Sequence, residues 1–165
     1  MNPADLTQIL DVLPSSTRTI TLPNGKEVAV SGIPLSDYVR IVRRFPHLLN
    51  LYLAPVNVAR ENVGKEIDAE AAKRDVGQRI VSSLIDADMD DQDAADTAFI
   101  AAGLGLAHNV DAEKVIATYP FETRDALLDA VEEMTYGGDQ SRFFGQVVRA
   151  LVGRTLRRVL AAAAS

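Results

Sequence analysis

The 165-residue sequence contains no cysteine and only two histidines, His47 and His108. Without cysteine the chain can form no disulfide, no thiolate metal site and no cysteine nucleophile. Two histidines leave little room for a histidine-based zinc site. No apolar run approaches the roughly 18 residues that a membrane-spanning helix needs, and the first residues lack the basic start and apolar core of a secretory signal. These absences predict a cytosolic protein without a cofactor.

A cationic surface is also lacking overall, because 17 basic and 23 acidic side chains give a net charge of −6. This balance disfavours a dedicated duplex-DNA binder. The charge is nevertheless uneven: residues 86–96 contain six aspartates, and five arginines follow Asp139 with no acidic residue among them. Those arginines form a solvated helix face, a docking surface for an acidic or helical partner, or a nucleic-acid contact. The last is disfavoured because no aromatic residues are interleaved for base stacking.

The N-terminal part of the sequence predicts a β-hairpin. Residues 1–17 are a weakly amphipathic lead-in, and two runs rich in β-branched residues at about 18–22 and 26–31 follow. Asn24-Gly25 lies between these runs, and both residues tolerate the positive φ angles of a tight hairpin turn. Pro34 ends the second strand because proline has no N–H to donate. We therefore expect the hairpin over residues 18–31.

Helical patterns occupy nearly all of the chain from Ser36 onward. Ser36 is expected to cap a helix that Pro46 ends or kinks. The apolar stretch from His47 to Val58 is either a buried short helix or a partner-facing segment. A helix from about 66 runs to an Asp-rich connector at 86–96. The remaining helices are expected at about 92–103, 111–118, 122–135 and 140–161.

Apolar spacing in the helix from about 66 predicts one buried stripe. The stripe has residues at i and i+4 with two further apolar neighbours, namely Ala72, Val76, Ile80, Leu84, Val81 and Ile85. Gly103 is expected as the C′ residue of the next helix, and the Ala-rich residues 161–165 as a frayed tail. The predicted fold is α+β, mostly α: an N-terminal β-hairpin followed by a bundle of five or six helices, in a single domain over residues 18–160.

Three motifs invite a chemical interpretation, and each is incomplete. Asp86, Asp88 and Asp90 match the first three ligand positions of an EF-hand loop, but the required glycine and glutamate are missing. Gly103-Leu-Gly105 is half of a dinucleotide fingerprint and follows a helix rather than a strand. His108-Asn109 precedes a helix start, where Asn109 or Asp111 is expected to cap. No G-x-S-x-G elbow accompanies the serines. We therefore expect no enzymatic activity, no metal and no cofactor.

Two groups of residues carry a resemblance to a known family. Val30, Gly32, Leu35, Ser36 and Asp37 lead into Arg44-Phe-Pro-His-Leu48. Further along stand Ala101-Ala-Gly-Leu-Gly105, Tyr119-Pro120 and the segment 126–136, followed by Phe143-Phe144. In this order, over about residues 18–152, the chain resembles the tail assembly chaperones of long-tailed bacteriophages, which are encoded just ahead of the tape measure protein. Ile33-Pro34 departs from the family pattern, and the extension after Val152 has no counterpart in it.

The resemblance implies a non-enzymatic chaperone in the cytoplasm of the bacterial host. Such proteins bind the long, helical tape measure protein and keep it soluble until tail-tube subunits polymerise around it. They are then absent from the mature virion. The implied partners are the tape measure protein, the tail tube protein and further copies of the chain, with no nucleic acid and no membrane. The alternatives are a structural tail-completion or connector component retained in the virion, and a DNA-binding regulator that uses Arg40, Arg43 and Arg44 or the terminal arginines.

Two sets of residues are the sequence candidates for partner binding. The first is the apolar segment whose members are Leu48, Leu49, Leu51, Tyr52 and Leu53. It would bind in helix-in-groove fashion, and plain core packing is its alternative. The second is the basic C-terminal set, Arg149, Arg154, Arg157 and Arg158.

Overall fold

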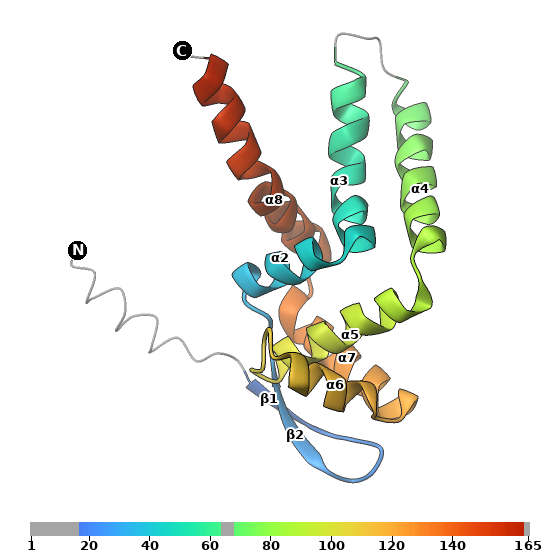
Figure 1. The fold of residues 1–165 in the computed structure, drawn as a ribbon, viewed down its shortest axis with the longest axis vertical. Helices are drawn as coiled ribbons and strands as arrows, with labels where there is room; N and C mark the ends of the chain where they lie inside the picture. Colours follow the sequence, from blue (N-terminus) through green and yellow to red (C-terminus); the bar gives the residue numbers. More distant parts are fainter. Residues whose placement is uncertain (1–16, 64–67, 164–165) are drawn as a thin grey trace, which may run out of the picture.

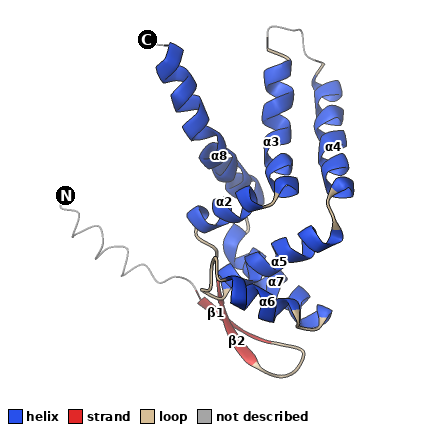
Figure 2. Ribbon diagram, in the orientation of Figure 1, coloured by secondary structure: helices blue, strands red, loops and turns tan. Residues whose placement is uncertain are grey.

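The computed structural model describes residues 17–63 and 68–163, with side chains described up to Gly153. An antiparallel hairpin of β1 (Thr17–Thr21) and β2 (Glu27–Ser31) precedes seven helices in these residues (Figures 1 and 2). The helices are α2 (Leu35–Arg44), α3 (Pro46–Glu61), α4 (Ala69–Asp86), α5 (Met89–Gly103), α6 (Val110–Ala117), α7 (Phe121–Tyr136) and α8 (Gln140–Ala163). The predicted class, α+β and mostly α, is confirmed.

The hairpin forms within one residue of its predicted bounds. Gly25 adopts φ +79°, and its N–H donates to Leu22 O at 2.8 Å, while the N–H of Lys26 donates to Asn24 Oδ1 at 3.0 Å. The turn residues therefore set the register, in which Thr19 faces Ala29. The predicted lead-in over 1–17 lies outside the described residues, except that Thr17 belongs to β1.

Two prolines set the ends of the next helices. Pro46 separates α2 from α3 as expected, because it cannot donate the N–H that would continue α2. The stretch 47–58 is accordingly part of a full helix. Ser36 is not the N-cap: Pro34 occupies that position with φ −56° and ψ 140°, and its carbonyl accepts from Tyr38 at 3.0 Å. Ser36 lies inside the first turn instead.

Predictions for the middle of the chain need two corrections. The Asp-rich connector expected at 86–96 is reduced to Ala87 and Asp88, since the Asp88 side chain caps α5 by accepting from the N–H of Asp90. The prediction that Gly103 is the C′ residue is also wrong. Gly103 is the last residue of α5, and Gly105 takes the left-handed position at φ +76°. At the predicted frayed tail, α8 runs on to Ala163.

The core lies where the hairpin, α2, α5, α7 and the start of α8 meet. Its fully buried side chains include Val30, Val42, Ile100, Val131 and Val147. From this core α3 and α4 project as an antiparallel helical hairpin, and the later part of α8 projects beside them (Figure 1). The projecting helices therefore have fewer neighbours to cover their apolar residues.

Candidate functional site

The predicted partner-binding segment 48–53 lies in α3 and faces largely inward. Tyr52 is 6% exposed, so it offers no contact surface. Its hydroxyl lies 2.7 Å from that of Tyr38, and its ring stacks on Phe144 at 4.8 Å. Part of the segment's surface stays open, because four leucines are only half-buried against the core, namely Leu48, Leu49, Leu51 and Leu53. Partner binding by these leucines stays a prediction.

Tyr52 belongs to an aromatic cluster that joins α2, α3, α7 and α8. Tyr38 packs edge-on against Phe143 at 4.8 Å and also contacts Tyr136, with the two hydroxyls 3.3 Å apart. Burial raises the pKa of Tyr38 and Tyr136, and it raises the pKa of Tyr52 to about 12. The three phenols thus stay protonated and serve as mutual hydrogen-bond partners inside the fold.

The outer face of α4 is a surface that sequence reasoning missed. None of the 18 residues of α4 is buried. Val81, Leu84 and Ile85 are 55%, 42% and 76% exposed, so α3 leaves much of each of these side chains uncovered. Met89, which opens α5, is 81% exposed. We call these four residues the α4–α5 apolar patch.

The predicted buried stripe on α4 is therefore wrong in its outer half. Ala72, Val76 and Ile80 are half-buried, whereas Val81 and Ile85 follow about 100° further round the helix. A single neighbour, α3, packs along α4 and covers only one side of it (Figure 1). The width of the apolar pattern was the signal available in the sequence, since six such residues span more than one face.

Polar tethers hold α4 against α3. Arg79 Nη2 lies 2.6 Å from Glu61 Oε2 on α3, and Asp75 within α4 holds the same guanidinium, with its Oδ1 3.0 Å from Nε. The hydroxyl of Ser83 donates to the carbonyl of His47 at 3.3 Å. The Asp68 side chain caps the start of α4. The contacts of Arg79 with Glu61 and of Ser83 with His47 thus tie α4 to α3, and none of them involves the apolar patch.

A second apolar surface lies between α3 and α4. This groove of about 450 Å³ is lined mainly by Pro55, Val58, Ala59, Ala72 and Val76. Pro55 lies inside α3, where its ring removes one backbone hydrogen bond. The helical hairpin therefore presents apolar residues both along its seam and on its outer side.

Of the four arginines in the basic C-terminal set, Arg149 is the one whose side chain the structure describes. Arg149 is exposed and its Nε donates to the carbonyl of Gly145 at 3.3 Å. Arg154, Arg157 and Arg158 belong to α8 but lie outside the residues whose side chains are described. Their role in partner binding stays a prediction.

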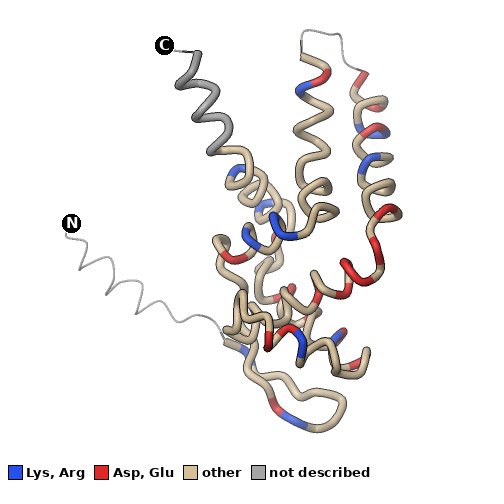
Figure 3. Tube along the Cα trace, viewed as in Figure 1, with Lys and Arg blue, Asp and Glu red and all other residues tan. Residues whose placement is uncertain are grey.

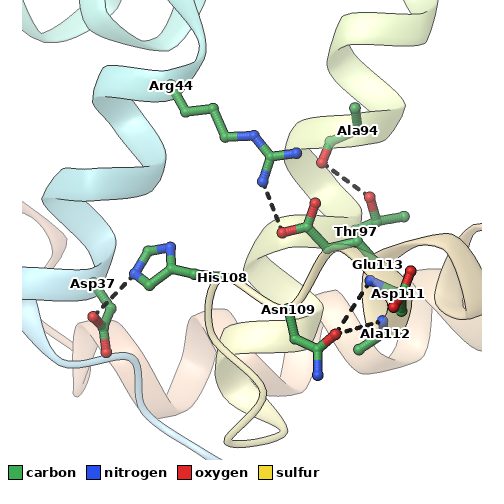
Figure 4. Close-up of polar contacts among 9 residues, drawn as sticks. All are labelled: Asp37, Arg44, Ala94, Thr97, His108, Asn109, Asp111, Ala112 and Glu113. Atoms are coloured by element: carbon green, nitrogen blue, oxygen red, sulfur yellow. Dashed lines mark hydrogen bonds and ion pairs between the residues drawn. The ribbon is translucent and has the colours of Figure 1, made fainter.

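Figure 4 shows that the residues around His108 join α2 to α6. Asn109 caps α6, as expected, by accepting from the N–H groups of Asp111 and Ala112 at 3.2 and 3.1 Å. His108 has φ +63° and places Nε2 at 3.2 Å from Asp37 Oδ1. The exposed end of Arg44 pairs with the buried Glu113 at 2.8 Å. These contacts have a structural role in fixing the start of α6.

Asp96 on α5 has a raised pKa. Burial raises the pKa of Asp96, and the neighbouring carboxylate of Asp93 raises it further. Asp93 itself pairs with Arg124 on α7. Among the described residues no three histidine, aspartate or glutamate side chains are grouped so that they could hold a metal ion.

The Gly103-Leu-Gly105 segment ends a helix. The N–H of Leu106 donates to Ala101 O at 2.8 Å and that of Gly105 to Ala102 O at 3.0 Å, which is the Schellman pattern. The helix-termination interpretation of this segment is thus the correct one.

No helix in the described parts of the chain has the length and apolar character required to cross a membrane. No protein-family model, curated protein or solved structure matches the chain.

Proposed function

We propose that this protein is a tail assembly chaperone of a long-tailed bacteriophage, which binds helical segments of the tape measure protein and keeps them soluble during tail morphogenesis. The observation that carries the proposal is the α4–α5 apolar patch. An amphipathic helix in a protein of this size normally buries its apolar side, and one left uncovered indicates a binding surface. The family resemblance of the sequence supplies the identity of the partner.

The arrangement of the hairpin supports this role. A chaperone of this kind must offer apolar surface while staying soluble itself, and a net charge of −6 opposes non-specific association. Because α3 and α4 project from the core, a long helical partner can lie along them without disturbing the aromatic cluster (Figure 1). In this proposal the protein acts by contact in the host cytoplasm, with the tail tube protein and further copies of itself as additional partners.

Co-expression with the tape measure protein tests the proposal. The variant Val81→Asp/Ile85→Asp places two charges in the patch and should weaken tape measure binding by at least about tenfold, since each buried aliphatic side chain contributes roughly 1.5–3 kcal/mol. The soluble fraction of the tape measure protein is the measurement. Val115→Asp is the matched control, because Val115 on α6 is as exposed as Val81, at 55%.

Two results would contradict the proposal. One is that co-expression of the wild-type chain does not raise the soluble fraction of the tape measure protein. The other is equal rescue by the patch variant and the wild type. Mass spectrometry of purified virions separates the alternative: a chaperone should be missing from the particle, whereas a tail-completion or connector component stays in it.

A further inference from the structure

Four carboxylates flank the residues of the α4–α5 apolar patch along the chain, and one of them, Asp86, also lines the groove between α4 and α3. Asp86 ends α4, Asp88 caps α5, and Asp90 and Asp91 lie in the first turn of α5. None of the four forms an ion pair with another described residue. Figure 3 shows this acidic group where the lower end of α4 meets α5. The patch is therefore apolar at its centre, and the negative charge beside it is not balanced by a neighbouring basic side chain in the described part of the chain.

Local stability explains only part of this acidic edge. Asp88 accepts from the N–H of Asp90 at 3.3 Å, and Asp90 and Asp91 lie at the positive end of the α5 dipole. Asp86 is the C-terminal residue of α4, and the negative end of the α4 dipole disfavours a negative charge there. Four like charges within six residues also repel one another. Asp86 lines the groove between α3 and α4, and its side chain forms no hydrogen bond or ion pair with another described residue that would offset this cost.

We infer that the α4–α5 apolar patch binds an amphipathic helix whose apolar stripe is flanked by lysines and arginines. Apolar residues with charges beside them are the arrangement through which paired helices select their partners. Unneutralised carboxylates favour a cationic helix and oppose an acidic one. They also oppose the pairing of two identical patches from two copies of this chain, which would bring eight carboxylates together. A basic helix of a different protein fits the surface better.

This inference rests on the proposed function, within which the bound helix is a stretch of the tape measure protein with that charge pattern. The test uses two synthetic helical peptides of about three heptads with the same leucine stripe. Lysines flank the stripe in one peptide and glutamates in the other. Binding of each labelled peptide to the full chain is measured by fluorescence anisotropy at low and at high salt.

The lysine-flanked peptide should bind at least about fivefold more tightly than the glutamate-flanked one, with the preference shrinking as salt screens the charges. Asp86→Asn/Asp90→Asn/Asp91→Asn should remove the preference and keep the affinity for the stripe. Asp88 stays unchanged because it caps α5. Ile85→Asp should weaken both peptides, and circular dichroism checks that each variant is folded.

Three outcomes overturn the inference. The first is equal binding of the two peptides. The second is binding of neither peptide while co-expression still keeps the tape measure protein soluble, a result that leaves the proposed function standing. The third is that Ile85→Asp dissociates an oligomer of this chain in sedimentation experiments while the wild type binds no peptide, because the patch is then an interface between copies. If co-expression does not raise the soluble fraction of the tape measure protein, that result counts against the proposed function. The charge preference of the patch is then still decided by the peptide-binding measurements.

Discussion

Gly103 is the residue at which α5 passes directly over α7. A β-carbon at this position would lie 2.1 Å from Cγ2 and 2.6 Å from Cγ1 of Val131, a side chain that is itself 1% exposed. Because core side chains are closely packed, the valine can move aside only by displacing its neighbours. The absence of a side chain at Gly103 is thus what allows the two helices to share the core.

Gly103→Ala should lower the free energy of unfolding by about 1–3 kcal/mol, the usual cost of overpacking a core. Urea unfolding followed by circular dichroism measures it. Gly145→Ala is the control, because a β-carbon on Gly145 of α8 meets no atom within 4 Å outside its own surroundings in the helix. That variant should gain about 0.5–1 kcal/mol from better helix propensity. Equal effects in both variants would contradict the close approach at Gly103.

The buried phenols make stability depend on pH in alkali. The pKa of Tyr52 is raised to about 12 in the fold, whereas an unfolded tyrosine ionises near pH 10. Between these values the unfolded chain releases a proton that the folded chain keeps. The stabilisation is complete below about pH 10 and is lost as pH rises toward 12, at roughly 1.4 kcal/mol per pH unit for each such tyrosine.

Tyr52→Phe should flatten this dependence. Urea midpoints of the variant and the wild type, measured from about pH 8 to about pH 11.5, should differ in slope by about one proton. Below pH 10 the variant should be about 0.5–1.5 kcal/mol less stable, because the hydroxyl of Tyr38 loses the nearer of its two hydroxyl partners, at 2.7 Å. Parallel curves would show that Tyr52 ionises normally in the folded protein.

Among the described helices, α4 is the one without a buried residue. Its ties to α3 include the pair between Arg79 and Glu61. Elements with little buried apolar surface open locally at low free energy. The arrangement suits a surface that must accommodate a partner.

Arg79→Ala should therefore speed hydrogen exchange of the α4 amides and leave those of α5 and α7 unchanged. Lys73→Ala is the matched control, since Lys73 pairs with Glu70 inside α4 at 2.8 Å. Mass spectrometry of deuterium uptake by peptide measures both variants. Faster exchange in α5 as well would mean that the two helices open as one unit, which would count against an independent α4.

The elements that the sequence predicts well are those whose ends are set by local chemistry. Asn24-Gly25 specifies the hairpin turn and Pro46 the break between α2 and α3, whatever lies around them. Burial is different, because it depends on how many neighbours an element has. Periodicity shows that α4 is amphipathic, but the exposure of Val81 and Ile85 follows from the lack of a second neighbour. For Tyr52 the core-packing alternative applies for the opposite reason, since Phe144 of α8 stacks on its ring.

At the scale of the described molecule, one group of basic residues and one group of acidic residues lie on different elements. In Figure 3, basic residues lie along α2 and the first part of α8, and acidic residues lie where α4 meets α5. In Figure 1, α3 lies between α8 and α4. A net charge of −6 therefore combines a basic end with an acidic one. In our proposal the two ends contact separate stretches of the same long partner.

Separate contacts should give additive losses. One variant neutralises the acidic edge, Asp86→Asn/Asp90→Asn/Asp91→Asn, and a second neutralises the basic end, with glutamine at Arg149, Arg154, Arg157 and Arg158. Each should weaken binding of a soluble tape measure fragment in titration calorimetry. Their combination should match the sum of the two binding free-energy losses to within about 0.5 kcal/mol, as for distant sites without shared partners. The opposite outcome is a combined variant that loses no more binding free energy than the weaker-binding single variant. Both ends would then contact one stretch of the partner, because the second set of substitutions would remove a contact that the first had already broken.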